Sequence, residues 1–190
     1  MRLILFVSLI VTCLSTLAQN KFEKEYKISA EKVPVKALGF TKQLISSTDA
    51  IKWYREESQD GTTLEAKLDR KGLLLSVEFD TTGQLIDLEI LVDHKDLPDS
   101  ISNEILHELD SSFQKYKIVK IQLQYSGLES DVLEVIKGSS DETAITVKYE
   151  VVVRAKADKS WQWYETTHDR NGTMIEKLII VRNNTDHLEY

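Results

Sequence analysis

The chain has 190 residues, of which 42% are hydrophobic and 29% are charged, with two Pro and one Cys. This composition is typical of a globular protein and excludes collagen-like, low-complexity and multispan membrane proteins. The net charge of −7 argues against a nucleic acid or an anionic membrane surface as the main partner, because either would repel the chain. The length suits one domain or two small repeats.

The first 18 residues predict a signal peptide. An apolar run at 3–14 follows a positive start and is too short to cross a bilayer as a helix. Ala18 is a small residue of the kind that signal peptidase reads, so we predict cleavage before Gln19. The alternative is a lipoprotein cut before Cys13, but Thr12 precedes this cysteine where a smaller residue is usual. We therefore expect a periplasmic or secreted protein with no membrane span after cleavage.

Two segments with helical spacing each begin after a proline. One follows Pro34 and the other follows Pro98, and in both of them apolar residues recur every three to four positions. Each is followed by four segments with the alternation and β-rich composition of strands. The predicted strands are 51–57, 63–69, 73–80 and 84–92 after the first helix, and 118–125, 145–155, 161–168 and 173–182 after the second.

Two of the expected hairpins resemble each other in sequence. One segment reads FDTTGQLIDLEILV and the other HDRNGTMIEKLIIV, which aligns Asp80 with Asp169 and Gly83 with Gly172. In each turn the Asp side chain can accept backbone N–H groups, and the Gly can adopt a positive φ. The expected strands that lead into the two turns also correspond.

These similarities between the two halves of the chain predict an α+β fold with two tandem repeats, each a helix plus a four-stranded antiparallel sheet. The repeats would form one curved sheet with the helices on one face. We assign 1–18 to the signal peptide, 19–96 to the first repeat with an N-terminal extension, and 97–190 to the second repeat. The polar stretch 127–143 is interpreted as an insertion in the second repeat.

Strand alternation separates a buried face from an open one. Leu75, Val77 and Phe79 share the side that the helices would cover, and so do Val119 and Ile121. The other side carries carboxylates, namely Glu65, Glu78, Asp87 and Glu89. We expect these to be solvated, with Lys67 nearby.

Several segments resemble those of the PepSY-like exported proteins of Gram-negative bacteria. They read FEKEYKISAEKVP, IKWYREES, LEAKLDRKG, SVEFDTTGQLIDLEI and YKIVKIQLQYSG. The fold of this family resembles that of the secreted β-lactamase inhibitor protein. The resemblance implies a periplasmic or secreted binding module whose relatives include protease propeptides and proposed inhibitors. It supplies no catalytic residues.

No catalytic, cofactor or metal signature is found in the sequence. His107 and Glu108 begin a helical zinc motif, but Ser111 stands where the second histidine is needed. The sequence has no nucleophile elbow, and no glycines are clustered as in a phosphate-binding loop. Asp169 begins a turn that lacks the later ligands of a calcium loop. His168 is expected to be a buried imidazole satisfied by a neighbour. We expect no enzyme activity, no cofactor and no metal.

The strongest candidate for a binding surface is aromatic. Trp161 and Trp163 lie two positions apart on an expected strand and therefore point to the same face, opposite the core. Paired tryptophans with a polar rim are typical of interfaces. The residues expected beside them are Lys120, Gln122, Gln124, Leu178 and Ile180. The alternative is that the tail 182–190 or the polar insertion covers both tryptophans.

Three functions remain open from the sequence. The first is an exported binding or inhibitor-like module that contacts a protein or peptide of the cell envelope through the open sheet face. The second is a structural or homodimeric envelope protein that buries the tryptophan pair between copies. The third is a small hydrolase that uses the open-face carboxylates.

Overall fold

The computed structural model describes residues 19–45, 51–139, 142–157 and 159–181. The predicted signal peptide, Cys13 and the tail 182–190 lie outside the described residues. No helix in the described part of the chain combines the length and the apolar character needed to cross a membrane.

Ten strands form one sheet in the order β1-β10-β9-β8-β7-β6-β5-β4-β3-β2. Neighbouring strands are antiparallel except β1 and β10, which run parallel. The strands are β1 (Gln19–Lys21), β2 (Glu23–Ile28), β3 (Lys52–Ser58), β4 (Gly61–Arg70), β5 (Leu73–Asp80), β6 (Leu85–Val92), β7 (Tyr116–Ser126), β8 (Thr146–Ala157), β9 (Ser160–His168) and β10 (Met174–Ile180).

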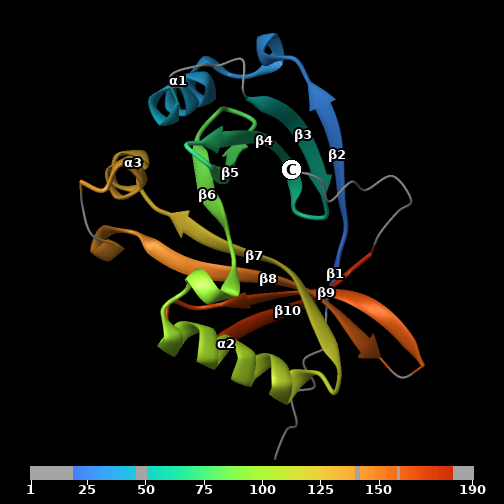
Figure 1. Cartoon of the computed structure of the whole chain (residues 1–190). Helices are drawn as coiled ribbons and strands as arrows, with labels where there is room; N and C mark the ends of the chain where they lie inside the picture. Colours follow the sequence, from blue (N-terminus) through green and yellow to red (C-terminus); the bar gives the residue numbers. More distant parts are fainter. Residues whose placement is uncertain (1–18, 46–50, 140–141, 158, 182–190) are drawn as a thin grey trace, which may run out of the picture.

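The first two strands hold the two ends of the sheet together. Only Phe22 separates β1 from β2 along the chain, yet β1 pairs with β10 and β2 pairs with β3. Beyond the end of β10, the Val181 N–H donates to the Lys21 carbonyl at 2.9 Å. One extended segment therefore joins both edges, and the sheet is curved and nearly closed (Figure 1).

Three α-helices in the described residues cover the outer face of the sheet. They are α1 (Val35–Leu44), α2 (Asp99–Ser112) and α3 (Glu129–Lys137), with single 3₁₀ turns at η1 (Ala30–Lys32), η3 (His94–Asp96) and η4 (Glu142–Ala144). α1 and α2 each begin directly after a proline, as the sequence predicts. α3 ends at Gly138, whose left-handed conformation is the usual helix stop.

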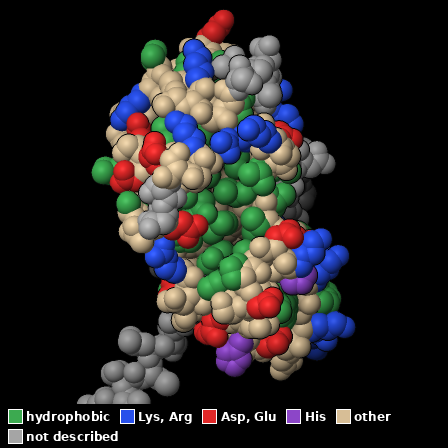
Figure 2. Space-filling view, turned by 60° about the vertical axis from the view of Figure 1, so that its left-hand side comes forward, with side chains coloured by type: hydrophobic (Ala, Val, Ile, Leu, Met, Phe, Trp, Pro, Cys, Tyr) green, Lys and Arg blue, Asp and Glu red, His purple; other side chains and the backbone are tan. Residues whose placement is uncertain are grey.

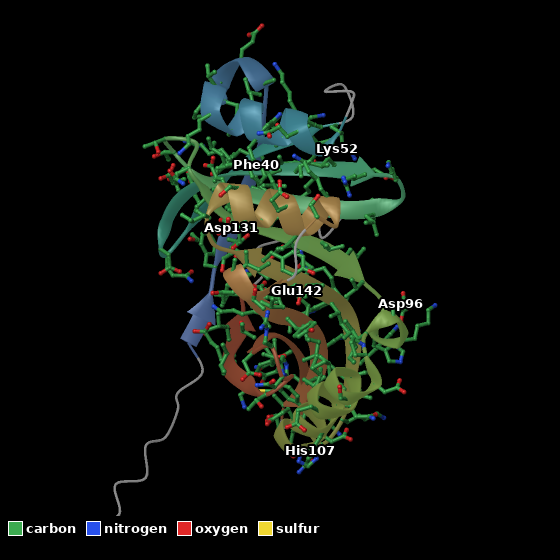
Figure 3. All side chains as sticks on the ribbon, turned by 90° about the vertical axis from the view of Figure 1, so that its left-hand side faces the viewer. Phe40, Lys52, Asp96, His107, Asp131 and Glu142 are labelled. Atoms are coloured by element: carbon green, nitrogen blue, oxygen red, sulfur yellow. The ribbon has the colours of Figure 1, made fainter. Side chains whose placement is uncertain are left out.

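The hydrophobic core lies between these helices and the outer sides of the strands. On α1, Ala37, Phe40 and Leu44 are buried at helical spacing. Phe40, which is labelled in Figure 3, packs edge-on against Phe79 of β5, and their ring centroids are 5.7 Å apart. Below α3, Glu142 accepts a hydrogen bond of 2.7 Å from the Tyr125 hydroxyl. Figure 2 shows hydrophobic side chains gathered at the middle of this helix-bearing side, with charged side chains around them.

The predicted fold class is wrong. The chain forms a single ten-stranded mixed sheet with three helices in the described part, not two repeats of a helix plus a four-stranded antiparallel sheet. The eight expected strands are all present close to their predicted bounds. Two further strands come from 19–28, which was interpreted as an N-terminal extension, and the third helix comes from the polar stretch 127–143. The division at residue 96 stays a prediction.

A bulge in β7 makes one prediction wrong, namely the sheet face on which Val119 lies. The register shifts between Ile118 and Lys120, so Val119 has no partner across the ladder and is 44% exposed. It was expected to share the core side with Ile121, which is buried. The bulge leaves Lys120 on the inner side of the sheet, as predicted.

The two hairpins that resemble each other in sequence make the same turn. Asp80 accepts from the N–H groups of residues two and four positions later, and Asp169 does the same. Gly83 has φ +86° and Gly172 has φ +89°. Each glycine also lies against a helix, because an added Cβ would be 2.8 Å from Pro34 Cβ at position 83 and 3.0 Å from the Ile101 carbonyl oxygen at position 172.

Candidate functional site: the inner face of the sheet

The sheet side opposite the helices, here called the inner face, encloses a cavity of about 170 Å³. Every one of the ten strands contributes to its lining, which shows how strongly the sheet is curved. The lining side chains are mostly charged or amide groups: Lys21, Glu23, Glu25, Glu56, Glu65, Lys67, Ser76, Glu78, Asp87, Glu89, Lys120, Gln122, Gln124, Glu150 and Glu165, with Val152 and Ile180. Nine carboxyl groups thus face three lysines.

Two lysines in this cavity are held by pairs of carboxylates. The Lys21 ammonium lies 2.8 Å from both carboxylate oxygens of Glu165 and 2.7 Å from Glu23. Lys67 lies 3.0 Å from Glu25 and 3.3 Å from Glu65. Burial alone would lower the pKa of each lysine, but the adjacent carboxylates outweigh it and raise both pKa values.

Amide and hydroxyl groups hold the central carboxyls. Gln122 donates to Glu89, and Gln124 donates to Asp87 at 3.1 Å and to Glu150 at 2.8 Å. On the neighbouring strands the Ser76 hydroxyl donates to Glu65. These contacts join β4 to β5, and β7 to β6 and β8, and they hold the carboxyls on the inner face.

Burial and mutual repulsion raise the pKa of most of these carboxyls. The pKa of Glu56 rises to about 9 through burial and the nearby charges of Glu23, Glu78 and Glu65. That of Glu150 rises to about 7 through burial and Glu165. Burial, with neighbouring carboxylates, also raises the pKa values of Glu25, Glu78, Asp87 and Glu89. The cavity therefore retains protons near neutral pH.

The expectation that the open-face carboxylates are solvated is wrong. Asp87 is 8% exposed and the Glu65 side chain is 13% exposed. The alternation of apolar and polar residues predicts the correct side of the sheet for these side chains. The curvature of the sheet encloses that side, and the sequence pattern of a single strand does not reveal this curvature.

The predicted site residues all lie on the inner side. Lys120, Gln122, Gln124 and Ile180 line the cavity, and Leu178 is opposite Glu165 in the ladder. Gln122 is only 3% exposed, so its amide is part of the cavity wall rather than a rim. Whether these residues bind a partner stays a prediction.

The two tryptophans extend the inner face toward the β8–β9 turn. Trp161 is 41% exposed, and its ring lies 5.5 Å from the Arg154 guanidinium and 6.0 Å from the Lys115 ammonium. Trp163 is half-buried and lies two residues from Glu165 on the same side of β9. The polar stretch 127–143 does not cover them, because the described part of it packs on the outer face.

Sequence reasoning missed eight cavity residues. They are Lys21, Glu23, Glu25, Glu56, Ser76, Glu150, Val152 and Glu165. Three of them, Lys21, Glu23 and Glu25, lie on β1 and β2, the strands that join the two edges of the sheet. The alternation Glu23-x-Glu25 was a signal of a strand, and its charged side could have been aligned with the carboxylates of the other strands.

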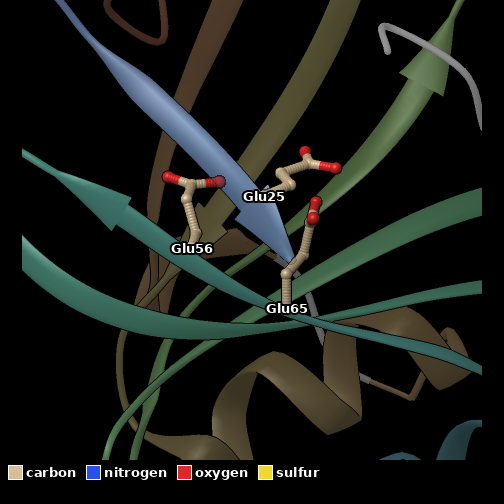
Figure 4. A group of neighbouring side chains, drawn as sticks. All are labelled: Glu25, Glu56 and Glu65. Carbon is tan, nitrogen blue, oxygen red and sulfur yellow. The ribbon is translucent and has the colours of Figure 1, made fainter. Parts of the chain in front are cut away.

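Three of the carboxylates come close enough to suggest a cation. One oxygen each of Glu25, Glu56 and Glu65 lie within 4.8 Å of one another (Figure 4). Carboxylate oxygens suit Ca²⁺ or Mg²⁺. However, the Lys67 ammonium already contacts two of the three groups, so the trio contains its own counter-charge.

His168 is a structural residue. It is fully buried, with Nδ1 2.9 Å from the Gly172 carbonyl oxygen and Nε2 3.0 Å from the Thr166 hydroxyl. Burial lowers its pKa, which keeps the ring neutral. This confirms the expectation of a buried, satisfied imidazole.

Comparisons with known proteins identify the fold and no family. A scan against protein families and a search of curated proteins both find no match. Among solved structures, a DUF2874 family protein from Bacteroides ovatus aligns with a TM-score of 0.50 at 13% identity, covering 77% of this chain and 87% of its own. A protein from Bacteroides eggerthii that is proposed to be periplasmic aligns with a TM-score of 0.50 at 14% identity, covering 77% and 88%.

A third structure, a BLIP-like protein from Bacteroides fragilis, covers 82% of this chain and 92% of its own at 15% identity. Its TM-score is 0.49. At these identities the likeness concerns the fold alone. The chain thus shares its architecture with Bacteroides proteins, and none of the comparisons tests the resemblance to PepSY-like proteins.

Proposed function

We propose that the protein is an exported, non-catalytic binding module of the cell envelope that contacts a protein or peptide through the inner face of its sheet. The observation that carries this proposal is the cavity built by all ten strands on the side that the helices leave uncovered. Concave sites are the usual places for binding. The fold shared with a protein proposed to be periplasmic, and the predicted signal peptide, support the location.

The tryptophans support a macromolecular partner. Trp161 is a large apolar side chain that remains 41% exposed, and it lies beside a charged cavity. Such aromatic residues are enriched among the residues that dominate binding energy at interfaces. The enclosed carboxyls hold protons near neutral pH, as a general acid does, and the hydrolase alternative is therefore tested directly below.

Site-specific photo-crosslinking tests the proposal in the native cell. The photoreactive residue p-benzoylphenylalanine is placed at Trp161 on the inner side, or as a control at Leu128, which is 70% exposed at the start of α3. We expect an envelope protein to be crosslinked from position 161 and not from position 128. Crosslinking only to a second copy would favour the homodimeric alternative. Absence of any crosslink from position 161 would contradict the proposal.

Purified protein then tests catalysis. A panel of glycoside and peptide substrates should give no turnover above that of a Glu150→Gln variant. Turnover that this substitution abolishes would instead support the hydrolase class, because Glu150 has the pKa of about 7 that suits a general acid.

A further inference from the structure

On the basis of this proposed function, we infer that the partner presents a lysine or arginine side chain, carried on an extended segment, that enters the acid-lined cavity of the inner face. The inference concerns the chemistry of the partner, and it rests on charge balance, on the geometry of the cavity and on its own bound lysines.

The first observation is the excess of carboxyls over lysines. Nine carboxyl groups and three lysines line the cavity, and the whole chain is also negative, with a net charge of −7. Burial and mutual repulsion keep part of these carboxyls protonated near neutral pH, and an entering cation would favour their ionised form. A cationic side chain is therefore the complement of this lining.

The second observation is that folding alone gives no reason for the arrangement. Glu25 lies opposite Glu56 in the β2–β3 ladder, and Glu78 lies opposite both Glu65 and Asp87 in the ladders on either side of β5. Like charges directly opposite each other destabilise a sheet. Three such pairs on adjacent strands put carboxyls where amides or alternating charges would be more favourable for the isolated protein.

The third observation is that the cavity already binds ammonium groups. Lys21 reaches it from β1 and is held by both oxygens of Glu165 at 2.8 Å. Lys67 reaches it from β4 and lies between Glu25 and Glu65. These two side chains show that an alkylammonium fits among the carboxyls and is stabilised there.

The geometry limits what can enter. A cavity of about 170 Å³ admits a side chain and excludes a folded domain. Beside β2 the cavity is open to solvent, because the side chains of Glu23 and Glu25 remain 38% and 32% exposed. Carboxylates at this exposed side and inside the cavity give an entering cationic side chain favourable contacts.

The neighbouring tryptophan suggests how the segment lies. Trp163 and Glu165 are two residues apart on one side of β9, which corresponds to about 7 Å along a strand. An extended peptide has the same repeat. A basic residue with an apolar residue two positions away would therefore contact both groups at once.

Peptide selection tests the inference without knowledge of the natural partner. A phage library of random twelve-residue peptides is selected on the full chain and, in parallel, on a Glu56→Gln/Glu150→Gln variant. In the free protein the pKa values of both residues are raised, so glutamine replaces carboxyls that are already partly protonated and the variant should fold. An entering ammonium or guanidinium group would favour the ionised carboxylate, which glutamine cannot supply. The matched control is Glu31→Gln/Glu134→Gln, which removes two carboxylates from exposed positions on η1 and α3.

We expect selected peptides to be enriched in Lys or Arg at a fixed distance from an apolar residue. A synthetic peptide of the selected sequence should bind roughly tenfold more weakly to the cavity variant, and about equally to the wild type and the control variant. Replacing its basic residue by norleucine should cost a similar factor. Thermal unfolding of all three proteins verifies that each is folded.

Three results would overturn the inference. Peptides selected without a preference for Lys or Arg would leave the crosslinked partner, and hence the binding function, in place but refute its basic character. Equal binding to the cavity variant and the control would attribute the affinity to the overall charge of the chain. A failure to select any peptide, together with a crosslink from Trp161, would mean that the partner does not insert an extended basic segment.

Discussion

The outer and inner faces of the sheet are built by the same strands and have opposite chemistry. Along β5, Leu75, Val77 and Phe79 point outward and are at most 1% exposed, while Ser76 and Glu78 point inward to the cavity. The outer face is sealed by helices and packs as an apolar core. The inner face is enclosed by curvature and retains carboxyls. Side chains in this protein are therefore buried either by helix packing on the outer face or by sheet curvature on the inner face. Only burial under the helices provides hydrophobic stabilisation.

The largest expected effect separates the two faces within one strand. Phe79→Ala removes a fully buried ring that contacts Phe40 and Trp53, and should lower the free energy of unfolding by about 3–5 kcal/mol. Glu78→Gln on the inner face should change it by less than about 1 kcal/mol, because the pKa of this carboxyl is already raised by burial. Urea unfolding at pH 7 measures both. Equal losses would mean that both faces contribute alike to stability.

A smaller effect is expected where the sheet meets the helices at its two equivalent turns. Gly83→Val should destabilise the protein by about 1–3 kcal/mol, because the position has φ +86° and a Cβ would approach Pro34 Cβ to 2.8 Å. Gly172→Val should behave similarly against α2.

Gly138 provides the control for these turns. It has φ +73°, but nothing lies within 4 Å of an added Cβ. Gly138→Ala should therefore show only the cost of the left-handed conformation, about 1–2 kcal/mol. A neutral Gly83→Val would mean that the turn can relax away from α1. Thermal unfolding of the Gly83→Val, Gly172→Val and Gly138→Ala variants measures the three losses of stability.

The pH dependence of stability sharpens the contrast at the inner face. Glu56 and Glu150 have folded pKa values of about 9 and about 7, well above those of an unfolded chain. Between pH 7 and pH 9 the folded state therefore holds more protons than the unfolded state, so stability should fall as the pH rises. In Glu56→Gln this decline should be smaller, since glutamine does not titrate.

The chosen range avoids the titration of His168 and of the two lysines. The lowered pKa of His168 affects stability only as the pH falls below about 6.5, where the unfolded imidazole gains a proton first. The raised pKa values of Lys21 and Lys67 affect it only above the usual lysine range, near pH 10.4. A decline in Glu56→Gln as steep as in the wild type, measured by urea unfolding at pH 7, 8 and 9, would assign the effect to other residues.

The smallest effect on stability is expected at the exposed end of the inner face. Trp161→Ala together with Trp163→Ala should leave the thermal midpoint nearly unchanged and weaken partner binding by about 2 kcal/mol or more per residue. Calorimetry with the crosslinked partner measures binding. A loss of about 3–5 kcal/mol of stability per residue would instead place the tryptophans in the core.

The sequence predicts the strands well because their signals are local. The Asp80 and Asp169 turns and the strict alternation from Leu75 to Phe79 depend only on neighbouring residues. The closure of the sheet depends on the pairing of β1 with β10 and of β2 with β3, which joins residues far apart in the chain. No local pattern encodes that pairing, so the carboxylates were assigned to the correct face and to the wrong environment.

α3 was missed for a different reason. Its buried residues are Val132 and Leu133, and the surrounding residues are polar enough to resemble a loop. Tertiary packing of a short apolar stripe, rather than the composition of the segment, makes it a helix.

The joining segment also sets an order for folding. β1 lies at the start of the described chain, and its partner β10 lies at the end, so this pairing closes a loop that contains nearly every other element. Such distant contacts carry a large entropic cost and form slowly. During synthesis the first strand emerges long before the last one exists. The ion pair between Lys21 and Glu165, which joins β1 to β9, therefore forms only after nearly all of the described chain has been synthesised.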